Sequence, residues 1–434
     1  MAMTYTATEH SPSYTGECMN HLLIFGGRRL FGTVTAEGAK NAALPILFAT
    51  LVTGGITILE NVPQIEDVRL ALSILSQLGA KILPLDAHSY RIDTRECQMS
   101  STPPKEAKKL RGSTYLLGAE AGRFGYGQCV LPGGCNLGER PIDQHIKALQ
   151  AFGCETKMSE GVVSFRTDGL LGTHFVFDKV SVGATINAIL CAVKAKGETM
   201  LEGVSKEPHV VDLVRYLKSC GASIEGEGTD TIFVSGGKVL HGTTYRIIGD
   251  MMEAGTYLIA GVATGGEVTV CGVDPSHLFC LSEMLQATGA SVTQTQSSIT
   301  AKATNIRLPL HLETAPYPAF PTDLHPQMSA LLCGIPGEST IHETIWEDRF
   351  RYTAEFARAG AKISPQSATV SIQGGAPLHG AIMQAVDLRA GAAEVILALM
   401  APGMSLVEGR DMICRGYESM DKKFRQLGGY VYAR

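Results

Sequence analysis

The chain has 434 residues, of which 45% are hydrophobic and 18% charged, and its formal net charge is -5. This length exceeds what a single hydrophobic core usually serves, so we expect two domains of the α/β class. The negative charge and the single tryptophan argue against a nucleic-acid-binding protein, because such proteins use basic surfaces and aromatic stacking.

The first segment, residues 1–20, is polar and has no basic region leading into an apolar core. We expect a disordered extension here and not a secretory signal. No apolar run reaches the roughly 18 residues that a membrane span needs, so no membrane partner is predicted. The eleven cysteines are irregularly spaced and include no Cys-x-x-Cys pair. A reducing cytoplasm is therefore predicted, with neither a disulfide framework nor a zinc site.

The first helix is predicted to begin at Lys40, in Gly38-Ala-Lys-Asn-Ala-Ala-Leu-Pro45. The positive end of a helix beside a lysine is a natural anion site, which makes Lys40 and Asn41 candidate ligand-binding residues. The alternative is a solvated lysine on a surface helix. Further along, Val68, Leu72, Leu75 and Leu78 recur at helical spacing and predict a helix with one face against a sheet.

Internal repeats are the strongest organisational signal. Glycines about 70 residues apart each follow a helical stretch and precede a strand: Gly79, Gly153, Gly221, Gly289, Gly360 and Gly428. A second series introduces short strands: Gly55, Gly127, Gly197, Gly266, Gly337 and Gly403. A glycine at a helix C-terminus provides the left-handed conformation needed there. The pattern predicts six similar units, arranged as two domains of three units that meet near Ile247–Glu253.

A glycine-rich segment, Leu131-Pro-Gly-Gly-Cys-Asn-Leu-Gly-Glu-Arg-Pro-Ile-Asp-Gln-His145, places Cys135 among glycines with Arg140 nearby. A cation favours a thiolate or an anionic ligand, so Cys135 is a candidate reactive residue. Packing is the alternative for a cysteine, and it is our interpretation of Cys191, Cys271, Cys280 and Cys333. Before this segment, the run Lys108-Lys109-Leu-Arg111 favours a solvated basic face, in which only Arg111 is a plausible phosphate contact.

In the second half, Thr314-Ala-Pro-Tyr-Pro-Ala-Phe-Pro-Thr-Asp323 is stiffened by three prolines and ends in a carboxylate. Asp323 is expected to cap the helix that follows, which is compatible with work as a general base. Arg349, Arg389 and Arg415 stand at junctions of the repeats and predict a clamp for a small, multiply charged anion. The motifs of P-loop, dinucleotide-binding, zinc-protease and serine-hydrolase proteins do not occur.

Seven segments occur in the order and spacing of one known family: Gly-Ala-Lys-Asn-Ala-Ala-Leu-Pro, Leu-Pro-Gly-Gly-Cys, Arg-Pro-Ile-Asp, Asp-Lys-Val-Ser-Val-Gly-Ala-Thr, Phe-Pro-Thr-Asp, Asp-Leu-Arg-Ala and Arg-Gly-Tyr-Glu. From about Leu22 to its C-terminus, the chain resembles the UDP-N-acetylglucosamine 1-carboxyvinyltransferases, which are enolpyruvyl transferases like EPSP synthase. The resemblance implies a two-domain inside-out α/β barrel, with three βαβαββ-type repeats in each domain and the active site in the interdomain cleft. It places residues 40–248 in the first domain, and residues 21–39 together with 249–434 in the second.

The resemblance also implies a reaction, and small-molecule substrates without a metal or organic cofactor. The enolpyruvyl group of phosphoenolpyruvate would pass to the 3-hydroxyl of UDP-N-acetylglucosamine by addition and then elimination of phosphate, in peptidoglycan precursor synthesis. Cys135 matches the proton donor, which fosfomycin alkylates, and Asp323 matches the carboxylate beside the attacking hydroxyl. The residues matching the phosphoenolpyruvate site are Lys40, Arg140 and Arg415, with Arg349 and Arg389 as further candidates. Asp387 is a further candidate substrate-binding residue. Those matching the nucleotide-sugar site are Asn41, Arg111, Arg140, Pro141, Ile142, Asp143, Gln144, Lys179, Val180, Ser181, Val182, Asp323 and Ile345, and the amides at Ser181–Gly183 suit a diphosphate.

Four residues depart from the family pattern: Met251, where the family has arginine, and Glu120, Gln144 and Glu394. They leave the proton-transfer residues untouched and bear on the identity of the acceptor. Two alternatives therefore stay open. One is an enolpyruvyl transferase that acts on another nucleotide or nucleoside. The other is a catalytically silent paralogue that binds a ligand and regulates a partner.

Overall fold

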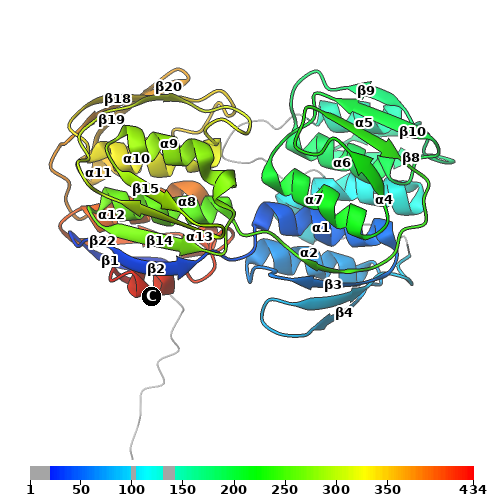
Figure 1. Cartoon of the computed structure of the whole chain (residues 1–434), viewed down its shortest axis with the longest axis horizontal. Helices are drawn as coiled ribbons and strands as arrows, with labels where there is room; N and C mark the ends of the chain where they lie inside the picture. Colours follow the sequence, from blue (N-terminus) through cyan, green and yellow to red (C-terminus); the bar gives the residue numbers. More distant parts are fainter. Residues whose placement is uncertain (1–19, 99–103, 131–141) are drawn as a thin grey trace, which may run out of the picture.

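The computed structural model describes residues 20–98, 104–130 and 142–434, and Figure 1 shows two lobes beside each other. The helices of the first lobe are α1 (Lys40–Thr53), α2 (Glu66–Gln77), α3 (Pro104–Lys109), η1 (Arg111–Tyr115), α4 (Leu116–Phe124), α5 (Asp143–Ala151), α6 (Val182–Ala192) and α7 (Pro208–Ser219). Its strands are β3 (Ile56–Glu60), β4 (Lys81–Pro84), β5 (Tyr90–Asp93), β6 (Tyr126–Val130), β7 (Glu155–Ser159), β8 (Val162–Arg166), β9 (His174–Val176), β10 (Glu198–Glu202), β11 (Ser223–Glu225), β12 (Thr231–Ser235) and β13 (Thr244–Arg246).

The second lobe contains both the beginning of the described chain and its end. Its helices are α8 (Met251–Ala263), η2 (Pro275–Leu278), α9 (Phe279–Ala287), η3 (Thr322–Leu324), α10 (His325–Cys333), α11 (Tyr352–Arg358), α12 (Leu388–Met400), α13 (Arg410–Ile413) and α14 (Met420–Gln426). Its strands are β1 (His21–Gly26), β2 (Phe31–Thr35), β14 (Glu267–Cys271), β15 (Ser291–Gln294), β16 (Ser298–Lys302), β17 (His311–Glu313), β18 (Gly337–His342), β19 (Lys362–Gln366), β20 (Thr369–Gly374), β21 (Ile382–Gln384), β22 (Gly403–Glu408) and β23 (Tyr430–Ala433).

The repeated unit is visible in the order of the elements. Strand β9, helix α6, strand β10, helix α7 and the hairpin β11–β12 follow one another, and β17, α10, β18, α11 and β19–β20 do the same. In both units the first two strands pair in parallel and the third and fourth strands close the sheet in antiparallel fashion. This is the predicted βαβαββ arrangement. Other units complete their sheets with distant strands, since β13 pairs with β3 and β2 pairs with β14.

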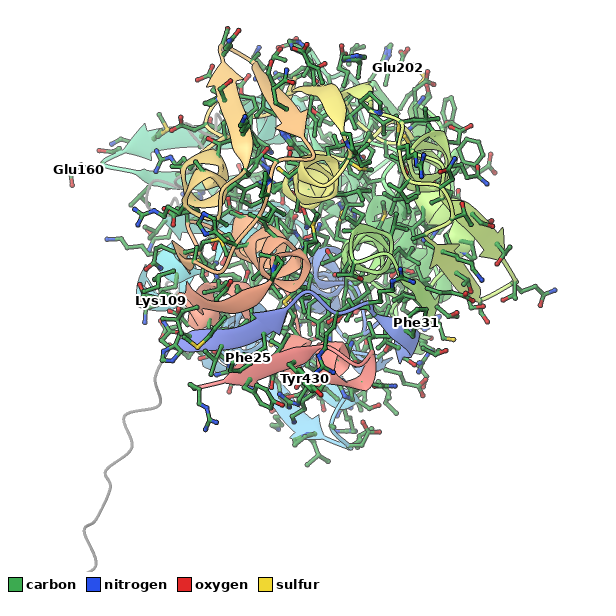
Figure 2. All side chains as sticks on the ribbon, turned by 90° about the vertical axis from the view of Figure 1, so that its left-hand side faces the viewer. Phe25, Phe31, Lys109, Glu160, Glu202 and Tyr430 are labelled. Atoms are coloured by element: carbon green, nitrogen blue, oxygen red, sulfur yellow. The ribbon has the colours of Figure 1, made fainter. Side chains whose placement is uncertain are left out.

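The lobes are built with helices inside and sheets outside, as the inside-out barrel requires (Figure 1). Helix α1 is apolar on all sides, and every residue from Ala42 to Thr53 is buried, as expected of a helix surrounded by protein. The sheets instead present large side chains to solvent on their outer faces. Figure 2 shows Phe25 and Tyr430, which are paired across β1 and β23, on such an outer face. The α/β fold class is thus confirmed.

The first glycine series behaves as predicted. Gly79, Gly153, Gly221, Gly289, Gly360 and Gly428 all have φ between 85° and 102°, a conformation that side-chain-bearing residues rarely adopt. The second series introduces strands as predicted at five of its six positions: Gly55, Gly197 and Gly266 directly precede β3, β10 and β14, and Gly337 and Gly403 begin β18 and β22. Gly127 lies inside β6, and the left-handed position after α4 belongs to Gly125.

Two hydrophobic cores fill the lobes. One is formed by buried residues between Ala39 and Ile247, and the other by residues between Leu22 and Ala36 together with those between Met252 and Val431. The chain crosses between the lobes twice, where Gly38 bridges Gly249 and the Ala39 amide donates to the Ile248 carbonyl at 2.7 Å. These cores support the predicted division at residues 39/40 and 248/249, which stays a prediction.

In the part of the chain that is described, no helix has the length and apolar character to cross a bilayer.

Glu394 makes the second core sensitive to pH. Its side chain is fully buried in α12, and neither carboxyl oxygen has a hydrogen-bond partner among the described residues. Burial raises its pKa well above the usual value of 4.5, and the charges of Glu355 and Asp387 raise the pKa further. The folded protein therefore keeps this carboxyl group protonated, whereas the unfolded chain releases the proton, so the free energy of unfolding falls as the pH rises above 4.5.

Replacing Glu394 with leucine should raise the free energy of unfolding at pH 8 by about 1–3 kcal/mol, because an unpartnered polar group leaves the core. The gain should be smaller at pH 4, where the unfolded carboxyl is also protonated. Urea unfolding of both proteins at the two pH values measures this difference. An equal gain at both pH values would show that Glu394 does not titrate between the folded and unfolded states.

Candidate active site

Lys40, Asp67 and Arg415 form a cluster between the lobes. Lys40 is the first residue of α1, and its Nζ lies 2.6 Å from Asp67 Oδ2 in α2. Arg415 follows α13 in the second lobe, and its Nε donates to Asp67 Oδ1 at 2.9 Å. The Lys40 side chain is only 12% exposed, so the alternative of a solvated surface lysine is wrong. One buried carboxylate thus joins two predicted anion-binding cations from opposite lobes.

The pKa shifts in this cluster follow from burial and charge. Burial is the largest influence on the pKa of Lys40 and lowers it; Asp67 opposes this effect, and Arg389 and Arg415 add to the lowering. Burial alone would raise the pKa of Asp67, but Lys40 and Arg415 outweigh it and hold that pKa below its usual value. The electrostatic influence of Arg389 on Lys40 shows that a third cation is close.

Asp323 is the centre of a second cluster. Its Oδ1 accepts a hydrogen bond from Arg349 Nη2 and its Oδ2 one from Arg389 Nε, both at 3.2 Å. The two arginine side chains are 1% and 3% exposed, whereas Asp323 is 32% exposed. The carboxylate therefore has buried cations behind it and an open side toward solvent.

The expected capping role of Asp323 is wrong. The residue lies within η3, whose N-cap is Pro321, and neither η3 nor α10 has a side-chain cap. The carboxylate binds the two arginines instead of the free helix amides, because buried guanidinium groups are the stronger partners. A cap of the predicted kind occurs at α12, where Asp387 Oδ1 accepts from the amides of Arg389 at 2.7 Å and Ala390 at 3.0 Å.

Asp250, at the second crossing between the lobes, connects the two clusters. Its Oδ2 accepts from the Lys40 amide at 3.3 Å, while its Oδ1 caps α8 through Met252 and Glu253. Burial would lower the pKa of Arg389, but Tyr417 and the charges of Asp323 and Asp250 outweigh it and raise that pKa. Lys40, Asp323, Arg349, Arg389 and Arg415 are therefore brought together around the interlobe crossing, although they come from distant parts of the chain.

The predicted nucleotide-sugar residues between Ile142 and Val182 lie near the starts of two helices in the first lobe, α5 and α6. Ser181 caps α6, with its Oγ accepting from the Ala184 amide at 3.4 Å. The side chain of Gln144, in α5, donates to Asp178 Oδ2 at 2.9 Å and accepts from the Asp178 amide at 3.1 Å. Lys179 is near enough to Asp143 to lower the pKa of that carboxyl, after the larger effect of the Gln144 hydrogen bond. Val180 is exposed, and Asn41, Ile142 and Val182 are half-buried.

Glu343 was not predicted, but it ties Ile345 to the Asp323 region. Its Oε1 accepts from the Ile345 amide at 2.9 Å, and its Oε2 accepts from the Thr322 hydroxyl at 2.9 Å. The same oxygen lies 2.8 Å from His325 Nδ1. Burial would raise the pKa of Glu343, but the His325 contact outweighs it and holds the pKa below its usual value. An ionised glutamate therefore fixes the loop that carries Ile345.

Three predicted residues, Cys135, Arg140 and Pro141, lie outside the described residues, as do residues 1–19 of the predicted extension. Arg111 is described only as the first residue of η1.

A surface cavity of about 460 Å³ is present in the second lobe, between Asn20, Gln384 and Asp411. Its lining contains none of the candidate residues, so the chemistry is argued from the two charged clusters.

Comparison with known proteins identifies the family of this chain. The family model for EPSP synthase (3-phosphoshikimate 1-carboxyvinyltransferase) matches residues 24–424. The UDP-N-acetylglucosamine 1-carboxyvinyltransferase of Clostridium botulinum is 45% identical over 95% of this chain and 99% of its own length. The UDP-N-acetylglucosamine 1-carboxyvinyltransferase 2 of Clostridium acetobutylicum is 42% identical over the same shares.

Solved structures show the same architecture. The enolpyruvyl transferase NikO from Streptomyces tendae superposes with a TM-score of 0.86 at 25% identity, covering 95% of this chain and 98% of its own. EPSP synthase from Acinetobacter baumannii has the same fold, with a TM-score of 0.73 at 18% identity, over 95% of this chain and 99% of its own. The chain therefore belongs to the EPSP synthase family of enolpyruvyl transferases and, within it, to the UDP-N-acetylglucosamine 1-carboxyvinyltransferases.

Proposed function

We propose that this protein transfers the enolpyruvyl group of phosphoenolpyruvate to the 3-hydroxyl of UDP-N-acetylglucosamine, releasing inorganic phosphate. The relatives from both Clostridium species, which align over nearly the whole chain, are named as UDP-N-acetylglucosamine 1-carboxyvinyltransferases, and this supports the proposal. The reaction would supply a peptidoglycan precursor in the cytoplasm. The domains would be residues 40–248, and residues 21–39 with 249–434, with the substrates bound between them.

The observation that carries the proposal is the convergence of cations beside one accessible carboxylate. Arg389 Nη1 is buried and has no hydrogen-bond partner among the described residues, while its Nε holds Asp323. A buried guanidinium nitrogen without a partner is costly unless a ligand completes it. A dianionic phosphate with a carboxylate on the same small molecule would supply acceptors for Arg389, Lys40 and Arg415 together.

The chemistry is a balanced addition and elimination. Asp323 accepts the proton of the sugar hydroxyl as the hydroxyl oxygen bonds to C2 of phosphoenolpyruvate, and the proposed acid, Cys135, gives its proton to C3 and becomes a thiolate. The thiolate then takes a proton back from C3, which restores the double bond as the C2–O bond to phosphate breaks, and the proton held by Asp323 leaves with the phosphate. The cations stabilise the negative charge on phosphate in both steps. Gln144, Lys179 and the capped start of α6 are proposed to hold the nucleotide.

Phosphate release from phosphoenolpyruvate tests the proposal directly. The purified protein should release one phosphate per acceptor when UDP-N-acetylglucosamine is present. UMP, other nucleotides and shikimate 3-phosphate serve as comparison acceptors. Turnover only with a different nucleotide would show that this nucleotide, and not UDP-N-acetylglucosamine, is the acceptor. No release with any acceptor would overturn the enzymatic assignment and favour a silent ligand-binding paralogue.

Cys135 should be the thiol that fosfomycin alkylates. The described cysteines of the first lobe are buried, and burial raises the pKa of Cys129 to about 12 and that of Cys154 to about 11. A thiol with a raised pKa is a poor nucleophile near pH 7. Mass spectrometry of the treated protein should place the label on Cys135, and Cys135→Ala should lose both label and turnover. A label on another cysteine, or full turnover of the variant, would contradict this role.

A further inference from the structure

Asn187 forms a buried polar junction in the first lobe. It lies in α6 and is 1% exposed. Its side chain makes three hydrogen bonds: Nδ2 donates to the Thr114 carbonyl at 3.0 Å, Nδ2 also contacts His145 Nδ1 at 2.7 Å, and Oδ1 accepts from the Gly118 amide at 2.8 Å. A buried amide that uses both of its hydrogens is strongly oriented.

The partners of Asn187 fix which atom is oxygen and which is nitrogen. The Gly118 amide can only donate, so it must face Oδ1, and the Thr114 carbonyl can only accept, so it must face Nδ2. The second hydrogen of Nδ2 then points to His145, and Nδ1 of that ring must accept it. His145 is therefore neutral, with its proton on Nε2.

Burial supports the same protonation state, since it lowers the pKa of His145 to about 4 and outweighs the opposing charge of Asp143. The ring lies close against the backbone of Gly183 in the first turn of α6. A methyl group added at Gly183 would come within 2.7 Å of His145 Cε1 and 2.9 Å of its Nε2. Such distances are shorter than packed carbon atoms tolerate.

The junction joins three segments that carry proposed nucleotide-sugar residues. Thr114 lies in η1, which begins at Arg111; His145 follows Asp143 and Gln144 in α5; and Gly183 follows Ser181 and Val182 at the start of α6. Neither Asn187 nor His145 is among the residues expected to touch the ligand. Both are buried, and together they contact all three segments.

We propose that Asn187 and His145 are positioning residues for the acceptor, which hold η1, the start of α5 and the start of α6 at the spacing that the nucleotide sugar requires. The proposal rests on the proposed function of these segments as the acceptor site. It predicts that disturbing the junction weakens acceptor binding and leaves the phosphoenolpyruvate site intact. In that site, Lys40 and Arg415 pair with Asp67 of α2 and not with Asn187 or His145.

Steady-state kinetics of His145→Ala, His145→Asn and Asn187→Leu test this with both substrates varied. His145→Ala and Asn187→Leu should raise the KM for the acceptor by roughly tenfold or more, because small misplacements of binding groups are costly. Their KM for phosphoenolpyruvate should stay within about twofold, since that site is untouched. His145→Asn keeps an acceptor atom at the δ position for Asn187 and should recover most of the acceptor affinity.

Gly183→Ala provides an independent test through steric contact. The added methyl group should push α6 away from His145 and raise the acceptor KM in the wild-type background. In a His145→Ala background the same substitution should add little, because the ring that it meets is gone, so the two effects are strongly non-additive. Gly122→Ala is the matched control. Gly122 lies in α4, and its added methyl group would come within 3.0 Å of the Leu190 carbonyl of α6, away from His145.

Two results would overturn the proposal. One is an acceptor KM within twofold of the parent value in His145→Ala. The other is an equal rise in both KM values that accompanies a loss of thermal stability, which a merely structural role would produce. If the parent protein uses a different nucleotide acceptor, the same measurements apply to that acceptor. A parent protein without any turnover would instead reject the proposed function itself.

Discussion

Replacing Asp323 with asparagine is expected to lower kcat by roughly 10²–10⁴-fold, the usual contribution of a positioned general base. Asparagine preserves the shape of the side chain and one acceptor oxygen, so the KM values should change far less than kcat. Stopped assays of phosphate release with saturating substrates measure the effect, and binding of the acceptor by calorimetry confirms that the site remains formed.

The surroundings of Asp323 make this a demanding test. Two buried arginines contact the carboxylate, one at each oxygen, while a third of the side chain remains exposed. The arginines therefore fix the direction of the carboxylate, and the exposed part is available to the substrate hydroxyl. Removing the basic oxygen should abolish proton transfer without removing the cations that bind phosphate.

Asp348→Asn is the matched control for Asp323→Asn. Asp348 belongs to the same lobe, but it pairs with Arg351 at the surface, and both side chains are about half exposed. Its loss should leave kcat unchanged, since surface ion pairs contribute little. A kcat of Asp323→Asn within threefold of the parent value would exclude Asp323 as the base and direct attention to another acceptor of the hydroxyl proton.

Much of the fold could be predicted because it repeats. Helix C-termini need a glycine in the left-handed conformation, and six of these at a nearly constant interval reveal six units. The exchange of strands between units has no such local signal. Strand β13 pairs with β3 almost 190 residues earlier, and β2 pairs with β14 more than 230 residues later. These pairings depend on how whole units pack, which periodicity alone does not specify.

The residue types that form the site could be predicted from the sequence, but the contacts between those residues could not. Lys40, Arg389 and Arg415 are conspicuous as cations at element boundaries, whereas Asp67, in the first turn of α2, has the position of an ordinary acidic residue at a helix N-terminus. A signal was nevertheless present, since Asp67 shares the buried face of α2 with Ala71 and Ile74 at helical spacing. A carboxylate on an apolar face must have a buried partner, or it would be expelled. For Asp323 the prediction was wrong for a different reason. Its position at the start of a helix favoured a capping role, but buried arginines bind its carboxylate instead.

Asp67→Asn is expected to have the second largest effect, and it should appear in the pH profile. Asp67 raises the pKa of Lys40 against the lowering by burial, Arg389 and Arg415. Without the aspartate charge that pKa falls further, so Lys40 loses its proton at a lower pH. If charged Lys40 holds phosphoenolpyruvate, kcat/KM for that substrate should decline on the alkaline side at lower pH than in the parent enzyme. The KM for phosphoenolpyruvate near pH 8 should rise by roughly tenfold, as expected for the loss of about 1.4 kcal/mol of binding.

Stability and pH dependence together separate this role from simple damage to the fold. Removing one partner of a buried ion pair costs about 3 kcal/mol of folding free energy, so Asp67→Asn should also unfold at lower urea concentration. Asp93→Asn is the control, because it removes a largely buried carboxylate of the same lobe whose partner is Arg95. Asp93→Asn should lose stability without a shift in the pH at which kcat/KM for phosphoenolpyruvate declines. In Lys40→Arg that decline should begin at a higher pH, because a guanidinium group stays charged. Asp67→Asn could lose as much stability as the control while the alkaline side of its kcat/KM profile stays where it is in the parent enzyme. That result would mean that Asp67 only supports the fold and that Lys40 does not bind substrate as a cation.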